Sequence, residues 1–129
     1  MTSIASDGPM TIFGIGSPHP RTYGTFARVL GSYVRDRNIL SLEEAVRKMT
    51  SLPAQILSID NRGLIQEGYY ADITIFDAST VTDKATFEDP HQYAEGIYSV
   101  LVNGVIVVEN GAHNGSKPGR VLRGPGYKY

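Results

Sequence analysis

The first half of the chain carries the spacing of an amphipathic helix. Over residues 22–38, apolar side chains recur at the intervals of about three and four residues that place them on one helical face. This apolar stripe consists of Phe26, Val29, Leu30, Tyr33 and Val34. We therefore predict a helix that begins at Thr22, ends near Asn38 and packs one face against a core.

A capping box predicts a second helix. Glu44 follows Ser41 at the spacing at which the Ser41 hydroxyl accepts a first-turn N–H while the carboxylate reaches back to the Ser41 backbone. Pro53 then interrupts the helical pattern. Because proline is tolerated in the first turn of a helix, we expect a further short helix, capped at residues 50–51, that runs through Leu57.

Two stretches outside the helices are predicted as strands. Residues 2–7 read as a short strand that ends in a turn at Gly8-Pro9. Residues 72–76 read as a strand with Ile73 and Ile75 on one face. After Gly63 the periodicity is strand-like, so the remainder of the chain is predicted to be mostly β.

The strongest local signal is a hairpin. Two runs rich in β-branched residues, 98–102 and 105–108, flank Asn103-Gly104. Both residues of this pair accept the positive φ that the two central positions of a type I′ turn require. Asn110-Gly111 and Asn114-Gly115 mark two further turns. The fold class predicted from these elements is α+β, with helices in residues 1–60 and a β-rich part in residues 61–129.

Composition and charge narrow the classes of partner. The chain has 129 residues, of which 41% are hydrophobic and 19% charged, as in an ordinary soluble domain. Its formal net charge is −1, without a block of like charges, so we expect no nucleic-acid and no membrane partner. The apolar run at residues 100–108 is too short to span a bilayer, and the N-terminus lacks a signal-peptide pattern. A cytoplasmic location is therefore expected.

The metal-ligating residue types do not form a recognisable site. The chain has no cysteine, which excludes disulfides and thiolate ligands. Its histidines are His19, His91 and His113, and none has a second histidine at a ligand-pair spacing. We predict no metal site in this chain and interpret His91 and His113 as exposed loop residues.

Two side chains are candidates for chemistry. Asp7 lies between Ser6 and Gly8, a pattern that on its own is typical of a turn. Arg21 follows His19-Pro20, and its guanidinium fork is suited to binding both oxygens of a carboxylate. On its own, this arginine is more typical of a solvated loop.

Tyrosine is the commonest aromatic residue, with eight copies. Tyr69-Tyr70 and the run Tyr127-Lys128-Tyr129 could form a stacking surface for a ligand. Partly buried edge or interface positions are the more usual place for such residues, because tyrosine combines contact area with a wettable hydroxyl.

The motifs occur in an order that resembles a known family. Ser6-Asp7-Gly8 precedes His19-Pro20-Arg21 and Tyr23-Gly24-Thr25-Phe26, and the glycine- and aspartate-bearing run of residues 63–77 follows. The similarity continues through residues 101–104 to residues 118–120. The chain resembles, over nearly its whole length, the C-terminal part of N-acyl-D-amino-acid deacylases (D-aminoacylases), which are metal-dependent amidohydrolases.

The resemblance implies a fold and a site. Residues 1–60 would correspond to the last strand and following helices of a (β/α)8 barrel, and residues 61–129 to part of a small antiparallel β-sandwich. Asp7 would act as the general base on a metal-bound water and then as the acid toward the leaving nitrogen. Arg21 would bind the α-carboxylate of an N-acyl-D-amino acid. The zinc ligands of the full-length family would precede residue 1.

Three hypotheses follow. In the first, the chain is a fragment or relative of a deacylase that hydrolyses non-peptide C–N bonds, inactive in isolation without the missing barrel portion and its zinc. In the second, it is a non-catalytic interaction module that forms homo-oligomers through exposed strand edges and helix faces. In the third, it binds a small molecule through Arg21 or the tyrosine-rich surface.

Overall fold

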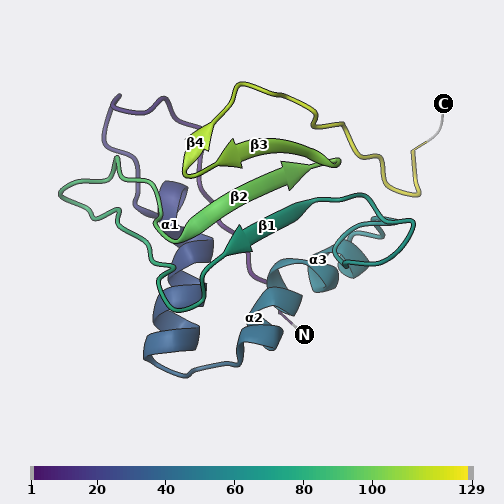
Figure 1. The fold of residues 1–129 in the computed structure, drawn as a ribbon, viewed down its shortest axis with the longest axis horizontal. Helices are drawn as coiled ribbons and strands as arrows, with labels where there is room; N and C mark the ends of the chain where they lie inside the picture. The colour runs from purple at the N-terminus through teal and green to yellow at the C-terminus, as the bar shows by residue number, and fades with distance from the viewer. Residues whose placement is uncertain (1, 128–129) are drawn as a thin grey trace. The chain divides into compact units, whose positions relative to one another are not determined.

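The structure, a computed structural model, describes residues 2–127 (Figure 1). The predicted positions Lys128 and Tyr129 lie outside the described residues. The helices are α1 (Arg21–Arg28), η1 (Val29–Asp36), α2 (Leu42–Met49) and α3 (Ser51–Ile56). The strands are β1 (Ile73–Phe76), β2 (Ile97–Val102), β3 (Val105–Glu109) and β4 (Ala112–His113). This content confirms the α+β class.

The described residues divide into two compact units. We call residues 5–45 and 76–97 the helix unit. The sheet unit comprises the other described residues, up to 4, from 46 to 75 and from 98 onward. The assignment of residues 1–60 to the end of a barrel, and of residues 61–129 to a sandwich, stays a prediction.

The long predicted helix is present, but its second half is wider than an α-helix. In the helix unit, α1 continues directly into the π-helix η1, where the Arg37 N–H donates to the Ser32 carbonyl, five residues earlier, at 3.0 Å. Asn38 has a φ of 49°, the left-handed conformation that ends many helices. Val29 and Leu30 of the predicted stripe are buried, whereas Phe26 is 44% exposed.

The segment after β1 packs closely on η1. Val81 is fully buried, and a Cβ added at Gly31 would lie 2.6 Å from the Val81 carbonyl oxygen. The Arg35 guanidinium donates to the same carbonyl at 2.6 Å. Only a glycine at position 31 permits this approach, and the arginine supplies a hydrogen bond to a buried backbone oxygen.

The two shorter helices form where the sequence predicts them. The Ser41 hydroxyl accepts the Glu44 N–H at 3.2 Å, which confirms the serine half of the capping box. Glu43 bonds its own backbone N–H and the Ser41 hydroxyl, and these contacts lower the pKa of its carboxyl. In the sheet unit, α3 begins at Ser51 and carries Pro53 in its first turn, as expected.

The predicted strand over residues 2–7 is wrong. Within the described part of the chain this stretch has no ladder partner. In the sheet unit the Ile4 N–H donates to the Lys48 carbonyl at 3.0 Å. A strand requires a neighbouring strand to pair its backbone groups, and no described strand pairs with these residues.

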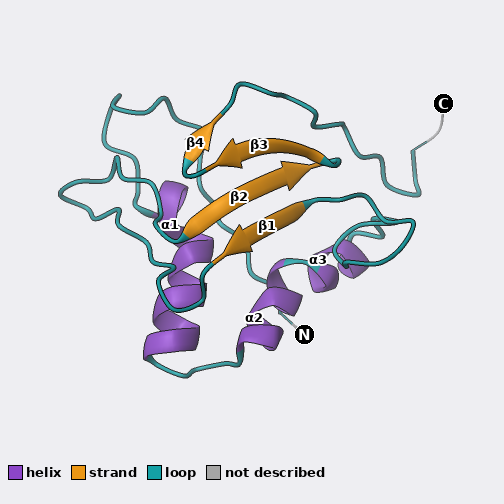
Figure 2. Ribbon diagram, viewed as in Figure 1, coloured by secondary structure: helices purple, strands orange, loops and turns teal. Residues whose placement is uncertain are grey.

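The sheet unit is built around a four-stranded sheet in the order β1-β2-β3-β4 (Figure 2). The predicted hairpin joins β2 and β3, with φ values of 49° at Asn103 and 80° at Gly104 that fit a type I′ turn. The turn at Asn110-Gly111 joins β3 to β4. The strand predicted at residues 72–76 is confirmed as β1.

One irregularity in the hairpin was not predicted. Leu101 faces Ile106, but the next pair is Val100 with Val108, so β3 carries one extra residue at Val107. This bulge shifts the register, and Val107 is the buried residue of β3. The turn therefore fixes the pairing only for the positions next to it.

A single arginine connects four parts of the sheet unit. Arg62 pairs with Asp72, donates to the Asn103 side chain at 2.5 Å and lies 4.3 Å above the Tyr70 ring. The Asn103 N–H donates to Asp72 at 2.8 Å, and its amide donates to the Pro118 carbonyl at 2.7 Å. These contacts join the loop after α3, the start of β1, the hairpin turn and the C-terminal segment.

We expect Arg62→Ala to lower the free energy of unfolding by about 3 kcal/mol, because it leaves Asp72 and Asn103 without their cation. Urea denaturation followed by circular dichroism measures the change. Arg120→Ala removes an exposed arginine and should cost less than about 0.5 kcal/mol. Equal effects of the two substitutions would contradict the assigned role of Arg62.

No helix among the described residues is long and apolar enough to cross a membrane. The cytoplasmic location stays a prediction.

Candidate functional site

The structure brings the two candidate side chains together in the helix unit. Arg21 Nη2 lies 3.1 Å from Asp7 Oδ2, and the two side chains are 44% and 82% exposed. Arg21 is the first residue of α1, and Asp7 lies in the irregular segment that precedes it in the chain. A solvent-accessible carboxylate and guanidinium therefore form one charge pair at the start of α1.

Local backbone geometry places Asp7 beside this helix. Asp7 has a φ of 46°, a region that few non-glycine residues adopt. A Cβ added at Gly8 would lie 2.9 Å from Thr22 Cα, so the chain can approach α1 this closely only with glycine. The Thr25 hydroxyl donates to the Ser6 carbonyl at 3.4 Å and to the Arg21 carbonyl at 2.9 Å.

His19 orients the start of α1. Its Nδ1 accepts the Arg21 N–H at 3.0 Å, which satisfies one of the unpaired donors of the first turn. The His19 ring packs edge-on against Phe87 with a centroid distance of 4.9 Å. His19 thus serves as a cap and contributes to positioning Arg21.

A second ion pair fixes the other end of α1. Arg28 Nη2 lies 2.6 Å from Asp83 Oδ2, and the Asp83 side chain is only 11% exposed. A Cβ at Gly24 would lie 2.7 Å from Asp83 Cβ. The close contact between Gly24 and Asp83 packs the segment of residues 76–97 against α1, the helix that begins at Arg21.

The interpretation of His91 as an exposed loop residue is wrong. Its ring is partly buried and both ring nitrogens are hydrogen-bonded, to Tyr23 of α1 and to the backbone at Gly14 and Gly16. His113, in contrast, is exposed as predicted, and its Nδ1 accepts the Gly115 N–H.

The described residues do not fit a metal centre. No three His, Cys, Asp or Glu side chains in residues 2–127 lie close enough together to hold an ion. We therefore derive no metal-dependent step from these residues.

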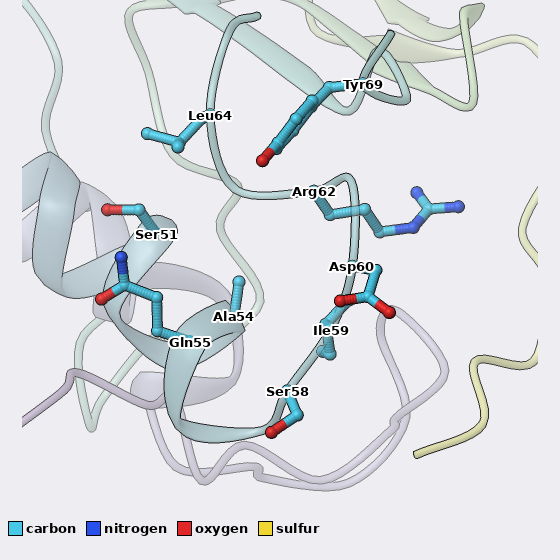
Figure 3. Close-up of a pocket in the computed structure, with 9 residues that line it drawn as sticks. All are labelled: Ser51, Ala54, Gln55, Ser58, Ile59, Asp60, Arg62, Leu64 and Tyr69. Atoms are coloured by element: carbon cyan, nitrogen blue, oxygen red, sulfur yellow. The ribbon is translucent and has the colours of Figure 1, made fainter. Parts of the chain in front are cut away.

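A cavity lies elsewhere, in the sheet unit. It has a volume of about 340 Å³ and is lined from α3 and the loop that follows it, with Ser51, Gln55, Asp60, Arg62 and Tyr69 as the polar contributors. Figure 3 shows the Arg62 guanidinium extending away from Ser51 and Gln55. Because that guanidinium is committed to Asp72 and Asn103, the cavity offers no free cation to a ligand.

Comparisons with known proteins define the family. The model of the Amidohydrolase family matches residues 2–108. The chain belongs to the amidohydrolase family. The match contains both candidate residues, Asp7 and Arg21, and extends through the hairpin.

Several curated relatives of the chain are deacylases. D-aminoacylase of Alcaligenes xylosoxydans xylosoxydans is 52% identical over 121 residues, which are 94% of this chain and 24% of the relative. The chain thus spans about a quarter of the length of the curated relatives it matches. The resemblance to N-acyl-D-amino-acid deacylases predicted from sequence is confirmed.

Solved structures give the same family. A D-aminoacylase mutant in complex with copper chloride superposes with a TM-score of 0.81 at 53% identity, over 82% of this chain and 22% of that one. N-acyl-D-glutamate deacylase from Bordetella bronchiseptica, solved with zinc and a phosphonate inhibitor, has a TM-score of 0.70 at 48% identity, over 70% and 19% of the two chains.

Sequence reasoning missed the residues that support the site. Asp83 and His91 lie more than 60 residues after Arg21 in the sequence, and no local spacing links them to α1. The one available signal was glycine: Gly8, Gly24 and Gly31 each mark a place where another segment approaches within 3 Å of an added Cβ.

We expect Gly24→Ala to lower the free energy of unfolding by about 1–3 kcal/mol, because the methyl group would overlap Asp83 Cβ. In an open helix the same change is usually stabilising by about 0.5–1 kcal/mol, so the sign of the effect is diagnostic. Thermal unfolding measures it. Gly119→Ala, with nothing within 4 Å of the added Cβ, should leave the midpoint unchanged.

Proposed function

We propose that this chain supplies the proton-accepting and carboxylate-binding segment of an N-acyl-D-amino-acid deacylase. The observation that carries the proposal is the 3.1 Å pair of Asp7 and Arg21 in a chain 52% identical to a D-aminoacylase. The reaction is hydrolysis of an amide C–N bond, which yields a carboxylate and a free D-amino acid.

In this reaction Asp7 is the proton carrier. A water oxygen attacks the amide carbonyl, and the Asp7 carboxylate accepts the proton that the water loses. The same proton then passes to the nitrogen as the C–N bond breaks, so the carboxylate is regenerated. The 82% exposure of the Asp7 side chain leaves it accessible to water and substrate.

Arg21 supplies the recognition of the substrate. An N-acyl-D-amino acid carries one α-carboxylate, and a guanidinium can bind both of its oxygens. The hydrogen bond from the Arg21 N–H to His19 and the ion pair of Arg28 with Asp83 support a fixed position for Arg21. Together these groups would set the distance between the substrate carboxylate and the proton carrier.

The chain alone is proposed to be inactive. The zinc of the Bordetella deacylase and the copper of the D-aminoacylase mutant belong to those proteins, and the described residues of this chain form no three-ligand group. A partner segment equivalent to the remainder of the relatives would be required.

A chimera tests the proposal. We would join this chain to the preceding part of the Alcaligenes D-aminoacylase in place of its own C-terminal segment and measure release of D-amino acid from an N-acetyl-D-amino acid. The chimera should be active, and this chain alone, with added zinc, should not. Asp7→Asn should lower kcat by about 100-fold or more. Arg21→Ala should raise KM by on the order of 100-fold.

Matched variants separate these roles from charge and folding. Asp36→Asn and Arg37→Ala change exposed residues of the same unit and should leave both constants unchanged. A substrate amidated at its α-carboxylate should be insensitive to Arg21→Ala. Full activity of the Asp7→Asn chimera, or release of product by the isolated chain, would refute the proposal.

A non-catalytic interaction module is the second candidate. One observation favours it: the loop of residues 10–15 in the helix unit exposes large apolar side chains. These are Met10 at 102%, Ile12 at 70%, Ile15 at 61% and Phe13 at 51% exposure. Contiguous exposed apolar surface commonly marks a contact with another protein.

If this loop mediates self-association, the isolated chain should form dimers or larger oligomers at high concentration, because pairing removes the apolar surface from water. Light scattering measures the mass. The double variant Ile12→Ser and Ile15→Ser should shift the equilibrium to monomer, whereas Val121→Ser, at another exposed apolar position, should not. A monomeric parent protein would exclude the module.

A further inference from the structure

His91 bonds three separate parts of the helix unit. Its Nδ1 lies 3.1 Å from the Gly14 nitrogen and 2.9 Å from the Tyr23 hydroxyl oxygen. Its Nε2 lies 3.0 Å from the Gly16 carbonyl oxygen. One imidazole therefore contacts the loop of residues 12–16 on both of its nitrogens and α1 through Tyr23.

The chemistry of these partners defines the protonation state. A backbone N–H only donates, so Nδ1 must accept from Gly14 and carries no proton. A carbonyl only accepts, so Nε2 must carry the proton that bonds Gly16. The contacts thus require neutral His91 with its hydrogen on Nε2, with the Tyr23 hydroxyl as a second donor to Nδ1.

Two glycines make the double contact possible. Gly14 and Gly16 have φ values of 81° and 74°, which side-chain-bearing residues rarely adopt, although an added Cβ would meet nothing within 4 Å. The loop bends at both residues, and the bends present one N–H and one C=O to the same ring.

Aromatic rings pack around the imidazole. Phe13 stacks on Tyr93 at 4.9 Å and meets the His91 ring edge-on at 5.6 Å. The titratable group shown to face the imidazole is the phenol of Tyr23, whose ring meets that of Tyr93 edge-on at 5.6 Å. Burial, and then Tyr93, raise the pKa of Tyr23, so its hydroxyl stays protonated over the range in which histidines titrate.

From this geometry we infer that His91 is a pH-sensitive latch, which binds the loop of residues 12–16 to α1 when neutral and releases Gly14 when protonated. A proton on Nδ1 would face the Gly14 N–H, donor against donor, and this bond would be lost. The Tyr23 oxygen can accept from Nδ1–H, and Gly16 can still accept from Nε2–H. Protonation therefore breaks one contact selectively.

The latch makes His91 a positioning residue for the site. The loop it binds lies in the chain between Asp7 and Arg21, and Tyr23 is two residues after Arg21 on α1. This consequence for catalysis rests on the proposed deacylase function. The latch itself does not, and it is tested on the isolated chain without substrate.

Amide hydrogen exchange of Gly14 by NMR tests the inference. Protection relative to an unstructured peptide is compared at about pH 7.5 and about pH 5, on either side of histidine titration. In the parent protein, protection of Gly14 should fall on the order of tenfold at the lower pH, as expected for loss of a hydrogen bond. The ring-nitrogen signals of His91 at the higher pH should show the proton on Nε2.

Three variants show whether His91 causes the pH dependence. For each variant we compare the protection of the Gly14 amide at the higher pH with its protection at the lower pH, as a ratio. The ratio should fall to about one in His91→Gln, whatever the level of protection, because glutamine does not titrate. Tyr23→Phe keeps the contact to Gly14 and should keep the ratio, as should His113→Gln, which alters an exposed histidine of the sheet unit. Equal protection at both pH values in the parent, a ratio retained in His91→Gln, or a proton on Nδ1 would overturn the latch.

Discussion

The sheet unit depends on satisfying one largely buried charge. The side chain of Arg62 is 10% exposed, and an unpaired guanidinium in such a position would be strongly destabilising. Asp72 supplies the counter-charge, Asn103 an acceptor and Tyr70 a π face. Because these partners come from separate segments, the requirement to neutralise one cation fixes the start of β1, the hairpin turn and the C-terminal segment together.

The helix unit is organised differently, by close backbone approach. Gly8, Gly24 and Gly31 each admit another segment to α1 or η1 at a distance that a methyl group would prevent. Charged groups then fix the approach, through Arg28 with Asp83 and Arg35 with the Val81 carbonyl. The candidate residues Asp7 and Arg21 lie at the surface of this arrangement, so their geometry depends on contacts made by other residues of the helix unit.

Local patterns were sufficient wherever a local interaction decides the structure. The capping serine at position 41, the proline in α3 and the Asn-Gly turns at residues 103–104 and 110–111 each act within a few residues, and these elements formed as predicted. The failures have a common cause in long-range contacts. The stretch of residues 2–7 has no strand partner among the described residues. The bulge in β3 places Val107 in a buried position, and the residues that His91 contacts lie more than 60 positions away in the sequence. Family resemblance supplied Asp7 and Arg21 as candidates, and only the structure showed that they form a pair.

The pairing of Asp7 with Arg21 couples the state of the carboxylate to the ability of the guanidinium to bind other anions. An incoming anion and the Asp7 carboxylate would compete for the same Arg21 guanidinium. Removing the aspartate would therefore leave the guanidinium more available, and anionic ligands would be bound more tightly. Substitutions at the two positions should be strongly non-additive, as expected for groups in direct contact.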